Sequence, residues 1–208
     1  MVAATQIGAE AGRFEEERRV LLSGVPWATY LVLRDTVESR GVRMTYLKGW
    51  LEIVTNGRTH EVGKTQIARL LELFCLEREI PLYGYGSTTF RKEEAERGLE
   101  PDECYSRGRD RETPQVALEV VVSNPLLDKL EVYRGLGIRE VWVFRVKLAA
   151  FQVFTLRGDH YQPITESEVL PEVPLARIAE LVRHPDQHAA LQAFRAELRA
   201  TSDQAPRS

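Results

Sequence analysis

The sequence predicts an α/β (α+β) domain in which helices flank one mixed central sheet, and two observations lead to this prediction. Helical and strand patterns alternate along the chain, as expected when helices cover a sheet. Within that alternation, residues 115–144 read as a strand, a helix and a second strand, which predicts a right-handed parallel crossover. A chain of 208 residues can bury one such core and still carry terminal extensions.

The first quarter of the chain predicts a loose start, a helix and a hairpin. Residues 1–19 are rich in Glu and Arg and show little apolar periodicity, so we expect a loose segment. Pro26 suits the first turn of a helix, and apolar residues follow it at helical spacing. Residues 44–54 have strand composition on both sides of Lys48-Gly49, which predicts a β-hairpin.

A long amphipathic helix is predicted at residues 59–78, because apolar residues recur at helical spacing until Pro81 stops the pattern. Its buried stripe would consist of Ile67, Leu70, Leu71 and Phe74. Residues 82–91 then read as strand material broken by glycines, and residues 93–97 as a polar turn.

The middle of the chain holds the strongest strand pattern. We expect a strand at residues 102–105, a polar loop at 106–113 and a buried strand at 115–122. Asn124-Pro125 fits an N-cap followed by a first-turn proline, so a helix is predicted to start there and to run to about Gly135.

Two further strands are expected at residues 141–144 and 151–154, and residues 175–200 read as helical with Pro185 as a divider. The chain is therefore expected to consist of a loose segment at 1–19, a folded domain at 20–183, and a C-terminal helix with a disordered tail at 184–208.

Composition excludes several classes of protein. No apolar run approaches the roughly 20 residues that span a bilayer, and no secretory signal is visible at the N-terminus. Cys75 and Cys104 lack metal-ligand spacing, so they are expected to be buried thiols in a reducing cytoplasm. The net charge of −3 argues against strong non-specific binding to nucleic acid.

Two carboxylates in the middle of the chain are the main functional signal. Glu119 lies inside the apolar run 116–122, where a carboxylate is costly unless it is paired or binds a cation. Asp102 lies on the preceding strand, and the alternation of side chains lets both acids reach one face. Two adjacent carboxylates favour a cation between them, and hard oxygen ligands favour Mg²⁺ or Mn²⁺.

A cation on the predicted helix extends this signal. Lys129 is spaced to lie on the inward face of its helix, close to the two acids. A lysine that snorkels past the core is the ordinary explanation for such a position taken alone. Beside two acids, a functional lysine is favoured, and the set has the parts of a metal-dependent phosphodiesterase.

These residues resemble those of a known family. The PD-(D/E)XK nuclease superfamily is resembled by Pro101-Asp102, Glu119-Val120-Val121 and the downstream Lys129. The finer similarity is to the bacterial Uma-two family of putative restriction endonucleases, and it is carried by Gly49-Trp50-Leu51-Glu52, Glu100-Pro101-Asp102-Glu103-Cys104-Tyr105, Glu119-Val120-Val121-Val122-Ser123, Lys129-Leu130-Glu131-Val132-Tyr133, Gly137 and Glu140-Val141-Trp142. The resemblance covers roughly residues 42–161 and implies a restriction-endonuclease-like fold.

The resemblance also implies roles for individual residues. Asp102, Glu119 and the backbone carbonyl of Val120 would hold Mg²⁺ (or Mn²⁺), and Asp102, Glu119 and Lys129 would be catalytic in cleaving DNA. The superfamily pattern has lysine two residues after the second acid, where this chain has Val121. Lys129 on the following helix would take that place.

Other polar residues are secondary candidates. His60 falls on the buried stripe of its helix and could support the metal pocket, although a core or capping histidine is the commoner case. Glu52 is a candidate outer acid. Arg107, Arg109 and Arg111 form a small basic patch that could contact nucleic-acid phosphates, or an ordinary solvated loop.

Two other functions fit parts of the pattern. A catalytically inactive module that keeps the nuclease fold, as a homodimer, is favoured by Val121 and by the acidic balance. A glycosidase would also use paired carboxylates, but the inward lysine and the lack of an aromatic sugar platform count against it. Metal titration together with a cleavage assay separates the nuclease from the inactive module.

Overall fold

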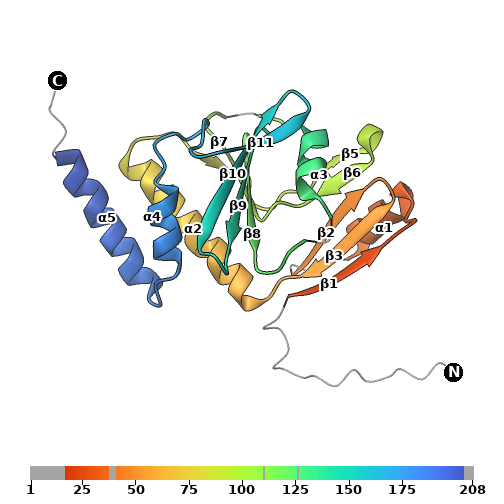
Figure 1. The fold of residues 1–208 in the computed structure, drawn as a ribbon, viewed down its shortest axis with the longest axis horizontal. Helices are drawn as coiled ribbons and strands as arrows, with labels where there is room; N and C mark the ends of the chain where they lie inside the picture. Colours follow the sequence, from red (N-terminus) through yellow and green to blue (C-terminus); the bar gives the residue numbers. More distant parts are fainter. Residues whose placement is uncertain (1–16, 38–40, 110, 126, 204–208) are drawn as a thin grey trace, which may run out of the picture.

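The computed structural model describes residues 17–37, 41–109, 111–125 and 127–203, which form two β-sheets and five α-helices (Figure 1). Across the first sheet the strand order is β1 (Arg18–Leu22), β3 (Trp50–Thr55), β2 (Val42–Leu47), β6 (Arg97–Leu99) and β5 (Phe90–Lys92). Across the second sheet it is β11 (His160–Ile164), β10 (Ala150–Arg157), β9 (Glu140–Arg145), β8 (Val116–Val121), β7 (Glu103–Ser106) and β4 (Tyr83–Gly84).

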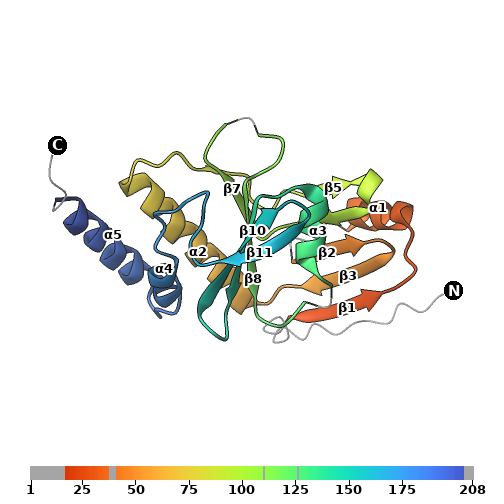
Figure 2. The same ribbon diagram turned by 45° about the horizontal axis from the view of Figure 1, so that its top comes forward.

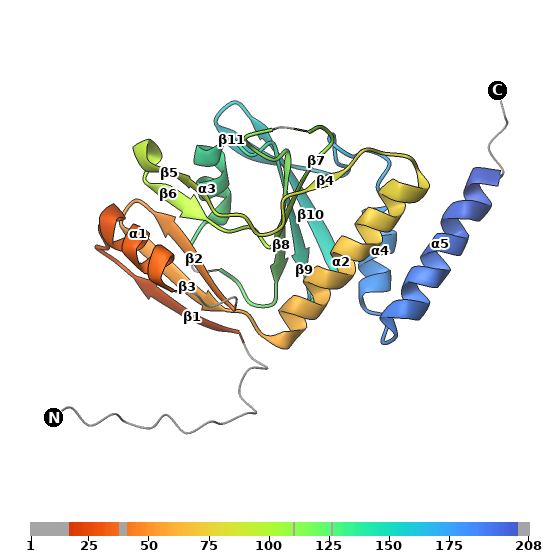
Figure 3. The ribbon, with the colours of Figure 1, turned by 180° about the vertical axis from the view of Figure 1, so that it is seen from behind.

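The helices cover these sheets from several sides. They are α1 (Trp27–Thr36), α2 (Arg58–Glu77), α3 (Lys129–Leu136), α4 (Leu175–Val182) and α5 (Gln187–Asp203), with a short 3-10 turn, η1 (Glu93–Ala95). Figure 3 shows α2, α4 and α5 gathered at one end of the molecule and α1 at the other. Among the described residues, no helix is long and apolar enough to cross a membrane.

The predicted α+β class is confirmed, and so is the mixed sheet. In the second sheet β8 and β9 pair in parallel, whereas β7, β10 and β11 pair antiparallel with their neighbours. The expectation of one sheet is wrong, because β2 and β3 have their own partners in β1 and β6. Those two partner strands were not predicted: β1 follows a charged run, and β6 has only three residues.

The N-terminal boundary also differs from the expectation. β1 starts at Arg18, two residues inside the segment expected to be loose, and it pairs with β3 along its whole length. Glu17 is described just before β1, whereas residues 1–16 lie outside the described residues, as does the end of the expected tail, residues 204–208. α4 and α5 lie on either side of Pro185, as predicted.

The observed start of α3 differs from the predicted one, and the difference affects the functional site. The helix does not start at Asn124-Pro125 but at Lys129, because the Asp128 carboxylate accepts hydrogen bonds from the backbone N–H groups of Leu130 (3.0 Å) and Glu131 (3.3 Å). Asp128 is thus the N-cap. The Asn124 side chain instead accepts from Arg145 (3.1 Å). This cap places Lys129 at the first position of the helix.

Side chains alternate between the two faces of β8, so this strand lies between two apolar cores. Val116, Leu118 and Val120 pack towards α2, whose predicted stripe Ile67, Leu70, Leu71 and Phe74 is fully buried. Trp142 and Phe144 belong to the same core. On the other face of β8, Ala117 packs with Val132 and Tyr133 of α3. Glu119 shares the face of Ala117 and therefore points towards α3.

α3 also contacts β2 and β6, so it lies between the two sheets (Figure 2). The first sheet has α1 on its outer face, where Tyr30 packs against Met44, Tyr46 and Leu51. The alternate residues of β2 and β3, including Thr45, Glu52 and Val54, therefore face inwards. The inner face of the first sheet and the end of β8 enclose the space that holds the predicted site.

Buried Glu140 fastens the loop after β11 to the second sheet. Its carboxylate accepts hydrogen bonds from Trp142 Nε1 (2.9 Å), Ser167 Oγ (2.6 Å) and the backbone N–H groups of Glu168 (2.7 Å) and Val169 (2.9 Å). Glu140→Ala would leave these buried donors without an acceptor, so we expect it to lower the free energy of unfolding by about 3 kcal/mol or more.

Urea unfolding monitored by far-UV circular dichroism measures this loss. The control is Glu166→Ala, an exposed carboxylate of the same loop, which should change stability by less than about 0.5 kcal/mol. Equal stability of the two variants would contradict the assigned role of Glu140.

Candidate active site

Two adjacent strands bring the predicted acids opposite one another. β7 and β8 pair antiparallel with Glu103 opposite Leu118, so Asp102 comes next to Glu119 across the ladder. The backbone N–H of Asp102 donates to the carbonyl of Leu118 at 3.2 Å and extends the ladder to that position. Both acids are buried, with 3% of Asp102 and 2% of Glu119 exposed.

Asp102 is held on one oxygen. Its Oδ2 accepts a hydrogen bond from the backbone N–H of Val120 (2.7 Å) and lies 2.9 Å from His60 Nε2. His60 is buried in the first turn of α2, and its Nδ1 lies 3.2 Å from Glu61 Oε1. The structure thus brings His60 directly onto the first acid, from a helix whose buried stripe fixes its orientation.

Glu119 is held on both oxygens by α3. Lys129 Nζ donates to Oε2 at 2.6 Å, and the Tyr133 hydroxyl donates to Oε1. Lys129 and Tyr133 are four residues apart, so they lie on the same face of the helix. Val121, at the position where the superfamily pattern has lysine, is buried beside the same site. α3 therefore supplies the cation that β8 lacks.

A small cavity of about 20 Å³ lies next to Asp102, His60, Val120 and Lys129. Glu17, Arg19 and Arg43 also line it, whereas Glu119 does not. A volume of this size holds about one water molecule. Nowhere in the described part of the chain do three or more His, Cys, Asp or Glu side chains come together in a group that could hold a metal ion.

The electrostatics of the first pair favour the charged forms. Burial alone would raise the pKa of Asp102, but the hydrogen bond and charge of His60, the charge of Lys129 and the Val120 N–H lower it below its usual value. Burial alone would lower the pKa of His60, but the hydrogen bond and charge of Asp102 raise it. Each residue therefore stabilises the ion on the other.

In the second pair, Glu119 and Lys129, the pKa of the acid is raised instead of lowered. Burial raises the pKa of Glu119, and the Asp102 charge adds to this effect, so the pKa is raised although Lys129 and Tyr133 oppose the change. Burial tends to lower the pKa of Lys129, but the charges of Glu119 and Asp102 raise it. Lys129 therefore keeps its proton, and a further cation next to Glu119 would favour the carboxylate form.

Some predicted residues lie elsewhere. Glu52 is buried on the inner face of the first sheet, where it accepts from Arg19 Nη1 at 2.8 Å and does not wall the cavity. The loop with Arg107, Arg109 and Arg111 projects from the opposite end of β7 and β8, roughly 16 Å along the strand from Asp102 (Figure 2). These arginines are therefore not part of this site.

Within that loop the arginines have local partners. Arg107 Nη1 donates to the carbonyl of Val169 at 3.4 Å, and the Arg109 guanidinium lies 5.7 Å from the centre of the Tyr83 ring. A solvated loop that packs on its own surroundings, which was the ordinary alternative, describes these contacts.

Sequence reasoning missed several residues that line the cavity or hold its walls. Tyr133 could have been found from its spacing of four residues from Lys129. Glu17, Arg19 and Arg43 had no such signal, because they reach the cavity only through the pairing of β1, β2 and β3. Long-range pairing of short strands is not readable from local periodicity.

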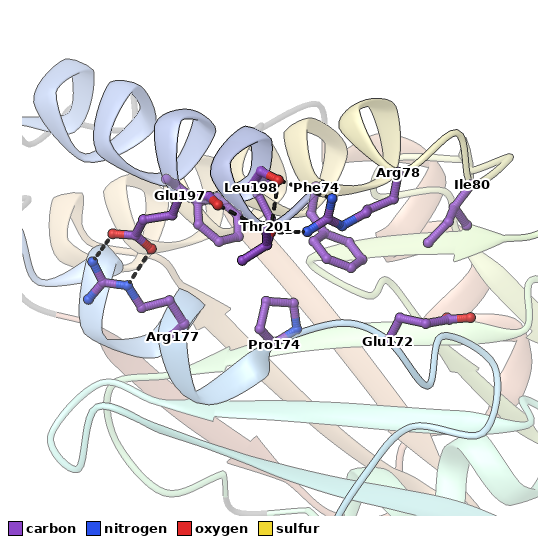
Figure 4. A pocket seen from close by; sticks show the side chains of 10 residues that line it. Phe74, Arg78, Ile80, Glu172, Pro174, Arg177, Glu197, Leu198 and Thr201 are labelled. Carbon is purple, nitrogen blue, oxygen red and sulfur yellow. Dashed lines mark hydrogen bonds and ion pairs between the residues drawn. The ribbon is translucent and has the colours of Figure 1, made fainter. Parts of the chain in front are cut away.

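The larger cavities do not mark this site. One of about 450 Å³ lies between the end of α2, α4 and α5 (Figure 4). Arg177 donates to both carboxylate oxygens of Glu197, and Arg78 donates to Thr201 Oγ1 at 2.6 Å on its wall. None of the predicted site residues lines this cavity.

Comparison with family models agrees with the resemblance read from the motifs. Residues 27–183 match the model of Uma2, described as "Putative restriction endonuclease". Among solved structures, the chain is similar to a putative nuclease belonging to DUF820 from Anabaena variabilis ATCC 29413. The two share 12% identity over 82% of this chain and 99% of that chain, with a TM-score of 0.43. No curated protein matches the chain.

The His60–Asp102 pair predicts a pH dependence of stability. Because the pKa of His60 is raised above 6.5, its contribution is present below pH 6.5 and is lost as pH rises through the folded-state value. Because the pKa of Asp102 is lowered below 3.8, its contribution is present above that pH and is lost as pH falls through the folded-state value.

We therefore expect the wild-type protein to lose stability relative to His60→Gln as pH rises from 6.5 through the raised pKa of His60. Urea unfolding at several pH values measures the difference. The control is His160→Gln, whose side chain is 60% exposed and which should leave the pH profile unchanged. Parallel profiles for wild type and His60→Gln would show that the pair does not stabilise the fold.

Proposed function

This chain belongs to the Uma2 family of putative restriction endonucleases, and on that premise we propose that it is an endonuclease that hydrolyses phosphodiester bonds in DNA with a divalent metal ion. The observation that supports this proposal most is the arrangement of two buried acids on neighbouring strands. Each has its own cation: His60 beside Asp102 and Lys129 beside Glu119. Burying two carboxylates has a large cost, so such an arrangement favours a functional site.

The residues fit a hard cation. Asp102 lines the cavity, and His60 and Val120 both contact its Oδ2. Asp102, Glu119 and the carbonyl of Val120 would hold Mg²⁺ or Mn²⁺, as the superfamily resemblance implies. Oxygen ligands of this kind suit these ions better than zinc. A bound divalent ion would polarise the phosphoryl oxygen and lower the pKa of an attacking water.

Lys129 has the chemistry of an electrostatic stabiliser. Its ammonium is 2.6 Å from Glu119, lines the cavity, and keeps its proton because the two acids raise its pKa. A protonated lysine cannot accept a proton from water, so it would act on negative charge that develops on the phosphoryl oxygens. Tyr133 fixes the other oxygen of Glu119 and so orients that carboxylate.

His60 is a positioning residue in this proposal. It contacts Asp102 on the oxygen that also accepts a hydrogen bond from the Val120 N–H. Because His60 stabilises the ionised form of Asp102, the acid is ready to bind a cation at neutral pH.

An inactive module that keeps the fold is the second candidate. Val121 favours it, since the usual lysine position is apolar, and a homodimer would then be its functional form. Purified protein incubated with supercoiled and single-stranded DNA, with and without Mg²⁺ or Mn²⁺, separates the candidates. Nicking or linearisation that requires the metal supports the nuclease, whereas intact DNA in every reaction supports the inactive module.

Asp102→Asn should abolish metal-dependent cleavage, because the amide has no charge with which to bind the ion. The variant keeps the size of the side chain and one oxygen for the Val120 N–H, so its far-UV circular dichroism spectrum should match that of wild type. Glu94→Gln, an exposed carboxylate on η1, is the matched control and should cleave normally. Cleavage by Asp102→Asn at the wild-type rate would move the activity to another site.

Lys129→Met should reduce cleavage on the order of 10²-fold or more, the loss typical of removing one transition-state donor. It also leaves Glu119 buried without its cation, so we expect stability to fall by about 3 kcal/mol. The double variant Glu119→Gln, Lys129→Met should recover most of this stability without recovering cleavage.

A comparison of unfolding and cleavage for the single and double variants separates the two effects. Lys129→Arg, which keeps the charge, serves as the conservative control. If Lys129→Met cleaved DNA as fast as wild type, Lys129 would have only a structural role.

A further inference from the structure

Two residues from outside the matched family region reach the candidate active site. Glu17 and Arg19 line the same cavity as Asp102 and Lys129, whereas the family match begins at residue 27. Arg19 belongs to β1, and Glu17 is the residue just before this strand. Among the described strands, β1 lies at the edge of the first sheet and pairs with β3 alone. The family resemblance therefore assigns them no role.

Arg19 is fixed in position by several acceptors. Its Nη1 donates to Glu52 Oε1 at 2.8 Å, which anchors one side of the guanidinium on the inner face of the sheet. Its other side turns to Ser123, just after β8, with Nε 3.1 Å from Ser123 Oγ and Nη2 3.3 Å from the Ser123 carbonyl. Arg19 thus links the edge strand to the end of the strand that carries Glu119.

The Glu17 carboxylate accepts hydrogen bonds from both the Arg19 guanidinium and the Ser123 hydroxyl. Its Oε1 accepts from Arg19 Nε at 2.6 Å and from Ser123 Oγ at 2.5 Å. Only 3% of the side chain is exposed, and its Oε2 is buried with no hydrogen-bond partner within the described residues. A guanidinium edge and a hydroxyl that converge on one anionic oxygen are also the donors that recognise phosphate.

We propose that Arg19 and Ser123 form a subsite for a phosphate oxygen of the nucleic-acid backbone, and that the Glu17 carboxylate occupies this subsite until the substrate displaces it. The subsite rests on the proposed nuclease function. With Glu17 in place the cavity is about 20 Å³, which is room for about one water and not for a phosphodiester. Glu17 can leave without breaking the sheet, because it precedes β1. Glu52 would keep the guanidinium oriented after it leaves.

The same contacts argue against Glu17 as a metal ligand. Glu17 Oε1 faces the Arg19 guanidinium, which a cation would have to displace. An internal anion in a phosphate subsite accounts for these contacts.

Glu17→Ala in the full-length chain tests the proposal, with inorganic phosphate as the probe in metal-free buffer. Emptying the subsite should tighten phosphate binding, measured by isothermal titration calorimetry, by about tenfold or more, the scale of one freed charge-assisted site. Adding Arg19→Met should remove that gain. Glu94→Gln, which removes one exposed carboxylate at a distance, should bind phosphate as wild type does.

Arg19→Met can fail to fold because it leaves Glu52 buried without this partner, so Ser123→Ala in the Glu17→Ala background is the second test. It removes one donor without creating an unpaired charge and should reduce the gained affinity. Equal phosphate affinity of Glu17→Ala and wild type would overturn the subsite, and so would a gain that survives the loss of Arg19 or Ser123. Weaker Mn²⁺ binding by Glu17→Ala with no gain in phosphate binding would overturn it in favour of a metal ligand.

The binding readout is independent of the nuclease proposal. A gain in phosphate affinity that depends on Arg19, in a protein that cleaves no DNA under any metal condition, would support the subsite and contradict the nuclease. Metal-dependent cleavage together with unchanged phosphate affinity would support the nuclease and contradict the subsite.

Discussion

The structure depends on one constraint, which is that two carboxylates are buried on neighbouring strands. Neither Asp102 nor Glu119 is more than 3% exposed, and like charges at this spacing repel unless cations lie close by. The chain meets this requirement with two separate partners, His60 from α2 and Lys129 from α3. α2 and α3 pack on opposite faces of β8, so the two partners reach the acids from the sides of two different cores.

Local features set each partner in place. The Asp128 cap determines that α3 starts at Lys129, so the Lys129 ammonium lies at the end of β8. One helical turn later, Tyr133 contacts the same carboxylate, that of Glu119. The stripe of α2 holds His60 at the buried end of its helix. From the first sheet, Arg19 brings a positive charge to the same cavity, and Glu52 holds its guanidinium in place. A site between two sheets can thus draw charged groups from both.

Much of this was predictable from the sequence, and the failures have physical causes. The apolar run around Glu119 and the periodicity of residues 59–78 have strong signals, because each is a continuous local pattern. The start of α3 was predicted wrongly at Asn124-Pro125, because this dipeptide resembles a helix cap and Asp128, four residues later, is a second candidate. Only tertiary packing selects between the two. β6 and β1 have no pattern of their own, and Arg19, which reaches Ser123 across 104 positions, could not be assigned before the sheets were known.

The separation of Arg19 from Ser123 has a consequence for the order in which the site assembles. Lys129 is 10 positions from Glu119, so their contact can form within one strand and helix unit, whereas closing the 104-residue loop costs about 2 kcal/mol more in chain entropy. The acid and its lysine can therefore meet early in folding, whereas the Arg19–Ser123 contact forms later. During synthesis Arg19 leaves the ribosome before Ser123 does, so this side of the site has to wait until about a hundred further residues have been made.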